Sequence, residues 1–253
     1  MRRIAVLALV LSLFGAATAP ARAEMAPDQK REIERIVRDY ILANPEVVEK
    51  ALMALDAKRQ QEQAAAQARA VHEMRDTILN SAHQAVVGNP EGKVTLVEFF
   101  DYNCGYCKRA LPDLMALIQS NPDLRVVMKE FPILSEGSVE AARISVAVKE
   151  QTPKRYLEFH RELLGRPGQA DRAKALQVAR DLGLDAKALE RAAKDKAVDE
   201  NLIEVQQLAH ALGIGGTPSY VVGDELVFGA VGFDQLQEKI AAERKACAGE
   251  TAC

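Results

Sequence analysis

The chain has few of the residues that would mark a disulfide-scaffolded, metal-bound or nucleic-acid-binding protein. Its 253 residues include only four cysteines, too few to scaffold a fold of this size. Its four histidines show no metal-ligand spacing. A formal net charge of −3 without a basic patch argues against nucleic acid as a partner. After the N-terminus, no apolar run is long enough to cross a bilayer.

The first 23 residues have the layout of a secretory signal peptide. Arg2 and Arg3 precede an apolar stretch, residues 4–17, and Ala21-Arg22-Ala23 is a small-x-small cleavage signature. A membrane anchor is the alternative, but the apolar stretch is short for a bilayer span. We therefore predict cleavage near Ala23 and export to the periplasm, where disulfides persist. Because three arginines are lost, the formal net charge changes from −3 to −6.

Residues 24–80 are predicted to form a helical arm and a spacer. Apolar side chains repeat at helical spacing within residues 28–41. They do so again within residues 47–55, after Asn44-Pro45-Glu46 restarts a helix with Asn44 as its N-cap. Residues 56–70 are almost entirely alanine and polar residues, which predicts an exposed helix. An arm this small must pack its apolar stripes on the body or on other copies, and the polar spacer favours self-association.

The body, residues 81–253, has the pattern of a small α/β sheet with a helical insertion. Residues 94–100 and 124–131 are predicted strands, with a helix from about Cys104 between them. A helical block follows over about 136–212. The pattern ends with two short strands, 219–222 and 225–228, and a helix over 233–244. This order predicts an α/β fold class with the helical block inserted into the sheet.

The pair Cys104 and Cys107 directly follows the first predicted strand of the body. A zinc site needs four ligands, and the chain has a single CxxC motif. A structural disulfide within this pair would cross-link almost nothing. At a helix start, however, the first sulfur lies at the positive end of the helix dipole, which stabilises a thiolate. We therefore predict a redox-active pair in which Cys104 is the exposed nucleophile and Cys107 the buried resolving cysteine.

Two stretches, FFDYNCGYCKRALP and GGTPSYVVGDELVFG, resemble the DsbA-like branch of the thioredoxin superfamily. With the N-terminal arm included, the chain is similar to the ScsC-like suppressors of copper sensitivity, which act as trimeric disulfide isomerases. The resemblance implies a thioredoxin fold with an inserted helical domain, and no cofactor or bound metal. It also implies a homotrimer, misoxidised or reduced exported proteins as substrates, and a membrane thiol reductase or oxidase as redox partner.

The resemblance assigns roles to further residues. Thr217-Pro218 matches the loop whose cis-proline lies beside the attacking sulfur, although an X–Pro bond is ordinarily trans. Glu98 lies six residues before Cys104, where DsbA-like proteins keep a buried acid that can shuttle the proton of the resolving cysteine. Lys129, in the next strand, is the candidate partner of Glu98. The alternative is that both charges face water at strand edges.

The dipeptide between the cysteines, Gly105-Tyr106, favours disulfide isomerisation over oxidation. It lacks the histidine of strongly oxidising DsbA-type sites, and CGYC also occurs in dimeric periplasmic isomerases. A monomeric dithiol oxidase and a copper-sequestering thiol protein are the alternative functions. The resemblance does not explain Cys247 and Cys253, which we predict to form a local disulfide. Binding of a soft metal such as copper is the alternative for that pair.

Overall fold

The computed structural model of the chain describes residues 25–248. Its residues divide into two compact units, one ending at Arg59 and one beginning at Gln60. The predicted signal peptide and the partner predicted for Cys247 lie outside the described residues, so both stay predictions. Within residues 25–248, no helix has the length and apolar character that a membrane crossing requires.

The described part of the first unit is helical. It consists of helix α1, Pro27–Ala43, and the first part of helix α2, Glu46–Glu73. The break between them lies at the predicted place. The Asn44 side chain donates a hydrogen bond to the carbonyl of Tyr40 (2.9 Å), so it serves the end of α1 and not, as predicted, the start of α2. No side chain of residues 25–59 is buried, so both apolar stripes are open to solvent.

The second unit is built on a five-stranded mixed sheet in the order β1-β3-β2-β4-β5. Strands β2 and β3 are parallel, and the other neighbouring pairs are antiparallel. The strands are β1 Ala85–Gly88, β2 Val94–Phe100, β3 Leu124–Glu130, β4 Ser219–Val222 and β5 Glu225–Phe228. The four predicted strands are confirmed to within one residue. Strand β1 was not predicted, because its four residues end at a glycine and show no clear alternation.

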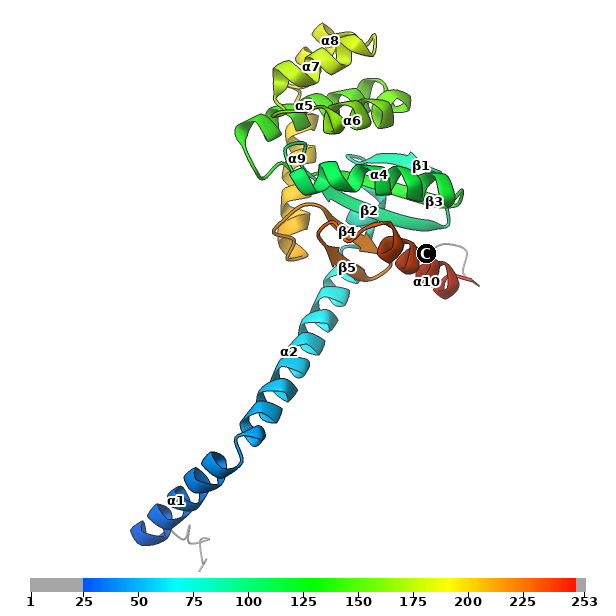
Figure 1. Cartoon of the computed structure of the whole chain (residues 1–253). Coiled ribbons are helices and arrows are strands. Elements are labelled where there is room, and N and C mark those ends of the chain that lie inside the picture. Colours follow the sequence, from blue (N-terminus) through cyan, green and yellow to red (C-terminus); the bar gives the residue numbers. More distant parts are fainter. Residues whose placement is uncertain (1–24, 249–253) are drawn as a thin grey trace, which may run out of the picture. The chain divides into compact units, whose positions relative to one another are not determined.

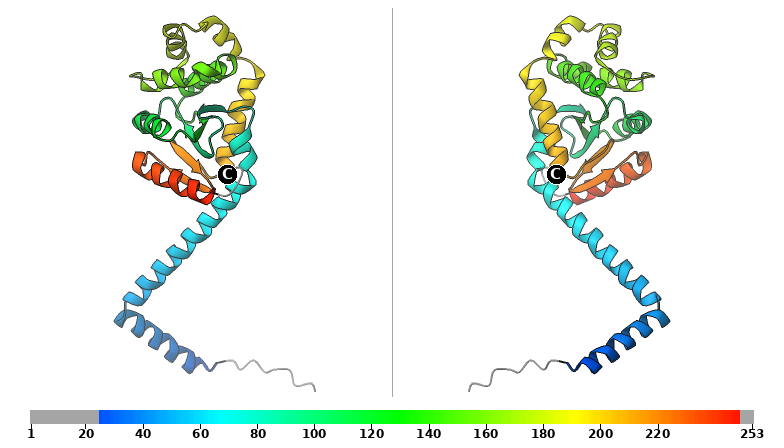
Figure 2. Two further views of the ribbon diagram at one scale, coloured as in Figure 1. Left: turned by 90° about the vertical axis from the view of Figure 1, so that its right-hand side faces the viewer. Right: turned by 90° about the vertical axis from the view of Figure 1, so that its left-hand side faces the viewer.

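Helices cover both faces of this sheet (Figures 1 and 2). One face carries α4, Gly105–Ser120, and α10, Phe233–Ala246. The opposite face carries α3, Arg75–Asn80, and α9, Lys196–Ala211. The inserted helices form a stack beyond the sheet, namely α5 Glu136–Gln151, α6 Tyr156–Gly165, α7 Arg172–Asp181 and α8 Ala186–Ala192. The predicted α/β fold class with its helical insertion is therefore confirmed.

Alternation along β2 divides the apolar core between the two faces of the sheet. Leu96 and Phe100 pack in the cluster under α4 and the insertion, whereas Val97 and Phe99 pack in the cluster on the opposite face. The second cluster also contains Val71, at the end of α2, and Ile78, in α3, each 1% exposed. The sequence predicts that the body begins at residue 81, but its core already includes residues before that position. A deletion through residue 80 would therefore remove part of the core.

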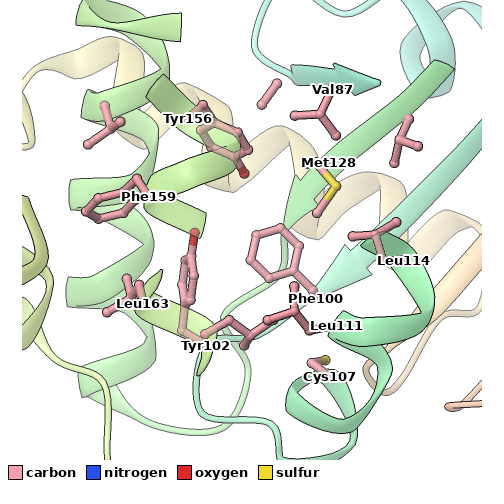
Figure 3. Packing of buried hydrophobic residues seen from close by; sticks show 14 of the residues in the cluster. Val87, Phe100, Tyr102, Cys107, Leu111, Leu114, Met128, Tyr156, Phe159 and Leu163 are labelled. Carbon is pink, nitrogen blue, oxygen red and sulfur yellow. The ribbon is translucent and has the colours of Figure 1, made fainter. Parts of the chain in front are cut away.

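A polar network is buried where the insertion meets the sheet. The Tyr156 hydroxyl donates to the Glu130 carboxylate (2.6 Å), and the Ser145 hydroxyl donates to the same oxygen (3.0 Å). The Tyr102 hydroxyl lies 2.7 Å from the Ser145 hydroxyl, and 3.3 Å from Nδ1 of His160. Figure 3 shows Tyr102 and Tyr156 within the packed cluster that also contains Cys107. The network thus joins the loop before the CxxC motif to β3 and two inserted helices.

The surroundings of His160, a member of this network, oppose its protonation. It is 1% exposed, and burial lowers its pKa to about 3. Its Nε2 atom has no hydrogen-bond partner in the described part of the chain. A proton on His160 would therefore be a buried, uncompensated charge.

We expect this histidine to make the body less stable in acid. Unfolding exposes His160, which then binds a proton below its ordinary pKa of about 6.5. The stabilisation is thus present above pH 6.5 and is lost as the pH falls toward 3, by roughly 1.4 kcal/mol per pH unit. Urea unfolding at pH 7 and pH 5 should show a smaller loss for His160→Gln than for the wild type. The exposed His210→Gln serves as the control, and an equal loss in all three proteins would contradict the expectation.

Candidate active site

The CxxC motif is located where β2 gives way to α4. Cys104 is the N-cap of α4, with an extended backbone (φ −74°, ψ 116°), and its Sγ accepts a hydrogen bond from the Cys107 amide (3.4 Å). The sulfur therefore faces the unpaired amides and the positive end of the helix dipole. Cys104 is 5% exposed and Cys107 is fully buried. The prediction of an exposed Cys104 is thus wrong in degree, although it is the more accessible of the two.

The Thr217-Pro218 loop, which directly precedes β4, lies beside the CxxC motif. Its peptide bond is cis, as the family resemblance implies. Antiparallel pairing places Ser219, the first residue of β4, opposite Phe99 near the end of β2. The residue before Pro218 therefore reaches the motif, and the Cys104 thiol donates a hydrogen bond to the Thr217 carbonyl (3.1 Å). Residues that are 113 positions apart in the sequence thus meet at one sulfur.

Cys107 is held in its thiol form by its surroundings. Burial is the main cause that raises its pKa well above the ordinary value, and the nearby charges of Glu98 and Cys104 raise it further. The backbone of Asp101 and the hydroxyl of Thr217 act in the opposite direction. The Thr217 hydroxyl is buried, and it has no hydrogen-bond partner at normal bonding distance among the described residues. A thiol held this way needs a base before it can attack a mixed disulfide.

Glu98 lies on the same face of the sheet as Cys107 and can supply that base. Its side chain is buried (2% exposed), and burial raises its pKa to about 8, with the Tyr220 hydroxyl opposing the shift. Tyr220 is its neighbour in β4. The Glu98 Oε2 atom has no hydrogen-bond partner among the described residues. A carboxyl group with a pKa near neutrality and a free oxygen can accept and return one proton at physiological pH.

Lys129 is not the partner of Glu98, so this prediction is wrong. The parallel register pairs Glu98 with Met128, and the next residue of β3 must point to the opposite face. There Lys129 is 1% exposed, and its Nζ donates to the carbonyl of Thr77 (2.9 Å). Burial lowers its pKa to about 8. The alternative that both charges face water is also wrong, because both side chains are buried.

The surface beside Cys104 is apolar and partly open. Tyr106 is 60% exposed and Phe228 is 47% exposed. They border a hollow of about 330 Å³ that includes the Thr217-Pro218 loop, lined by Tyr106, Gly216, Thr217, Pro218, Ser219, Phe228, Gly229 and Ala230. Within residues 25–248, no group of three or more histidine, cysteine or acidic side chains is arranged to hold a metal ion. The arrangement therefore leaves a partly open surface next to the cysteine pair.

Two residues of the site, Asp101 and Tyr220, were not predicted from the sequence. Asp101 is 1% exposed, and its carboxylate accepts hydrogen bonds from the amides of Asn103 (2.7 Å), Ile133 (2.9 Å) and Leu134 (3.0 Å). It thereby holds the loop before the motif against the loop after β3. Tyr220, which touches Glu98, was treated only as part of a strand. An aspartate directly after a buried strand was the available signal for Asp101.

Comparison with known proteins agrees with this geometry. Residues 95–241 match the DSBA-like thioredoxin domain family, and residues 29–62 match the copper resistance protein ScsC N-terminal domain. A solved thioredoxin-like oxidoreductase from Silicibacter pomeroyi is 44% identical, with a TM-score of 0.65, and the match covers 68% of this chain and 98% of that one. Proteus mirabilis ScsC in a transitional conformation is 32% identical, with a TM-score of 0.65 and coverage of 88% and 100%.

A third relative points to the same chemistry. Disulfide bond formation protein D of Bacillus subtilis is 28% identical over 175 residues, which is 64% of this chain and 78% of that protein. The fold, the buried Glu98 and the paired cysteines define a thiol–disulfide oxidoreductase of the DsbA/ScsC type. The chain belongs to the DSBA-like thioredoxin domain family and carries an ScsC N-terminal domain.

We expect Cys104 to react first with an alkylating reagent. Its sulfur is at the helix N-terminus and is the more accessible one, whereas burial keeps Cys107 a thiol. Limited iodoacetamide treatment of the reduced protein, followed by peptide mass analysis, should find the label on Cys104. Alkylation should be slow in the matched variant Cys104→Ser, which keeps only the buried thiol, and fast in Cys107→Ser, which keeps the reactive one. Label found first on Cys107 would reverse the assignment.

We expect Glu98→Gln to slow the second chemical step. The amide cannot accept the Cys107 proton, so release of a mixed disulfide on Cys104 should slow about 100-fold, the low end of general-base effects. The same variant should also change how stability depends on pH. In the folded wild type the Glu98 carboxyl group stays neutral up to about pH 8, whereas in the unfolded chain it ionises above pH 4.5. The wild type should therefore lose roughly 1.4 kcal/mol of stability per pH unit as the pH rises from 4.5 to 8, opposite in sign to the effect of His160, and Glu98→Gln should not show this loss.

Quenched-flow trapping of the mixed disulfide measures the rate, and urea unfolding at pH 5 and pH 8 measures the stability. Glu238→Gln, an exposed acid on α10, is the control. Wild-type release rates in Glu98→Gln would exclude the proton-transfer role, whatever its stability.

Proposed function

We propose that the chain is an exported protein disulfide isomerase that works as a homotrimer. The observation that carries this proposal is the exposure of both apolar stripes in the first unit, next in sequence to a DsbA-type domain. The large apolar side chains of α1 and early α2 are each 38–74% exposed, namely Ile33, Ile36, Val37, Tyr40, Ile41, Leu42, Val47, Val48, Leu52, Met53 and Leu55. A stable monomer rarely leaves so many side chains in water along one short segment.

The first unit offers a continuous surface for other copies of itself. Around the break between α1 and α2, a hollow of about 500 Å³ is lined mainly by apolar residues, namely Ile41, Leu42, Pro45, Val48, Glu49, Leu52, Met53 and Asp56. Covering such a surface stabilises an assembly by about 25 cal/mol for each Å² of apolar area removed from water. The match of residues 29–62 to the ScsC N-terminal domain supports self-association at this segment.

Several active sites on one assembly suit isomerisation better than oxidation. An isomerase attacks one sulfur of a wrong disulfide, holds the mixed disulfide, and must then be displaced by a second substrate thiol. A substrate held by more than one subunit stays at high local concentration during that wait. We therefore assign residues 25–59 to assembly. The substrates are exported proteins with wrong disulfides, and the absence of a histidine between the cysteines supports shuffling.

The redox partner follows from the electron balance. Isomerisation neither gains nor loses electrons overall, but it starts from the reduced Cys104–Cys107 pair. Each time the pair closes on itself, a substrate disulfide has been reduced and the enzyme has become oxidised. A thiol reductase, in the membrane that bounds the periplasm, must then return two electrons. The predicted signal peptide supports this location.

We expect deletion of residues 24–59 from the mature chain to separate assembly from thiol chemistry. This cut spares Val71 and Ile78, so the body should fold as a monomer. It should oxidise a small dithiol peptide, or reduce the disulfide form of that peptide, at the wild-type rate, and it should lose most reactivation of scrambled ribonuclease. Light scattering coupled to size exclusion measures the mass, which we expect to fall from three chains to one.

A pair of point variants tests the same idea without a deletion. Ile36→Asp places a charge in the apolar stripe, and Arg38→Asp places the same charge two residues later. Only the first should dissociate the assembly. A monomeric wild-type protein, or a truncated protein that reshuffles ribonuclease as well as the full one, would instead support the alternative, a monomeric dithiol oxidase.

A further inference from the structure

The residue directly before the attacking cysteine is bound to the helical insertion. The Asn103 side chain forms a two-bond pair with the backbone of Ala170. Its Nδ2 donates to the Ala170 carbonyl (2.9 Å), and its Oδ1 accepts from the Ala170 amide (2.6 Å). A neighbouring β-strand would bond the amide and carbonyl of Ala170 in the same way. Here both bonds come from the side chain of Asn103, which is 67 residues away in the sequence.

Asn103 also contacts the start of α5. Its Nδ2 lies 3.0 Å from the Ser138 hydroxyl and 3.3 Å from the Ser135 hydroxyl. Ser135 is the N-cap of α5, and Ser138 is fully buried. Asn103 therefore joins three segments, namely the active-site loop, the first turn of α5 and the segment before α7.

A second tie lies on the other side of Cys104. In the first turns of α4, the Lys108 Nζ donates to the carbonyls of Gly168 (3.0 Å) and Arg166 (3.3 Å). These carbonyls belong to the same segment as Ala170. Residues 166–170 are thus fastened to the chain one residue before Cys104 and four residues after it. The motif can shift relative to the insertion only if these bonds break.

We propose that Asn103 is a positioning residue for Cys104. By fixing the chain just before the helix start to the insertion, it holds the sulfur where the Cys107 amide and the end of α4 stabilise its thiolate. It acts through the backbone, because no hydrogen bond joins its side chain to either sulfur in the described residues. The inference rests on the thiol–disulfide chemistry of the site and is independent of the proposed trimer and isomerase activity.

The physical reason is that a helix dipole acts over a short range. Its effect on a charge falls off within the first turn, so a small displacement of Cys104 weakens it. Cys104 is in an extended conformation as the N-cap, and the helix alone does not fix that residue. The nitrogen of the Cys107 amide is already 3.4 Å from the Cys104 sulfur, so a small further separation would weaken this hydrogen bond.

Asn103→Ala tests this directly, with Asn121→Ala as the matched control. Asn121 is at the other end of the same helix, is 4% exposed, and donates to the Leu117 carbonyl (3.0 Å) and to Gln237 (2.7 Å). Both substitutions remove a hydrogen-bonded asparagine flanking α4, so both should lower stability. Only Asn103→Ala should change the sulfur.

Two readouts separate positioning from stability. The first is the pH profile of Cys104 alkylation by iodoacetamide in the reduced full-length protein, which should move to higher pH by about half a unit or more. The second is the equilibrium with glutathione. Since the thiolate exists only in the reduced form, losing its stabilisation should shift the equilibrium toward the disulfide about threefold or more. Ser138→Ala removes one of the partners of Asn103 and should give a smaller shift of the same sign.

The proposal holds if Asn103→Ala moves both readouts and Asn121→Ala moves neither. It is overturned if Asn103→Ala leaves the pH profile unchanged. It is also overturned if both alanine variants shift equally, because general loosening of α4 would then be the cause. If Asn103→Ala does not fold, Ser138→Ala decides, a shift supporting the proposal and a wild-type profile overturning it.

Discussion

The antiparallel pairing of β2 with β4 is the constraint on which the active site depends. It sets Glu98 beside Tyr220, and it brings the start of β4 to the end of β2. The CxxC motif follows β2, and the Thr217-Pro218 loop precedes β4, so the two halves of the site meet at the Cys104 sulfur. A slip of one residue in this register would turn Glu98 away from Cys107 and leave its carboxyl group on the wrong face.

The site combines groups that are each unfavourable where they lie. Burial keeps Glu98 protonated up to about pH 8 and keeps Cys107 a thiol. Both groups lower the stability of the folded protein, because a buried polar group without a full set of hydrogen bonds costs free energy. Their pairing has a chemical use, because the Glu98 carboxylate that forms near neutral pH can take the proton of the Cys107 thiol. The negative charge then moves from the carboxylate to the thiolate, and the net charge of the interior does not change.

Much of this was predictable, because the strongest signals were local. A CxxC after an apolar strand and a Thr-Pro before a short one predict the cysteine pair and its loop, and the strand limits follow from the same pattern. The errors concern three-dimensional neighbours. Glu98 and Lys129 are both charges in apolar strands, and only the register of β2 and β3 shows that they lie on opposite faces. The role of Val71 was missed because it follows a long run of alanine and polar residues, residues 56–70, which predicts an exposed helix. Asn103 gave no signal at all, because its partners are separated from it by 32 to 67 residues.

The hydrogen bond from Cys104 to the Thr217 carbonyl has a consequence for the order of events. That bond exists only while the sulfur carries its proton. When Cys104 ionises to attack, the carbonyl oxygen loses its donor and faces a negative charge instead. The same ionisation therefore creates a nucleophile and a vacant backbone acceptor beside it. A polypeptide substrate of the kind proposed above would present both an electrophilic sulfur and backbone N–H donors, and would satisfy the two together.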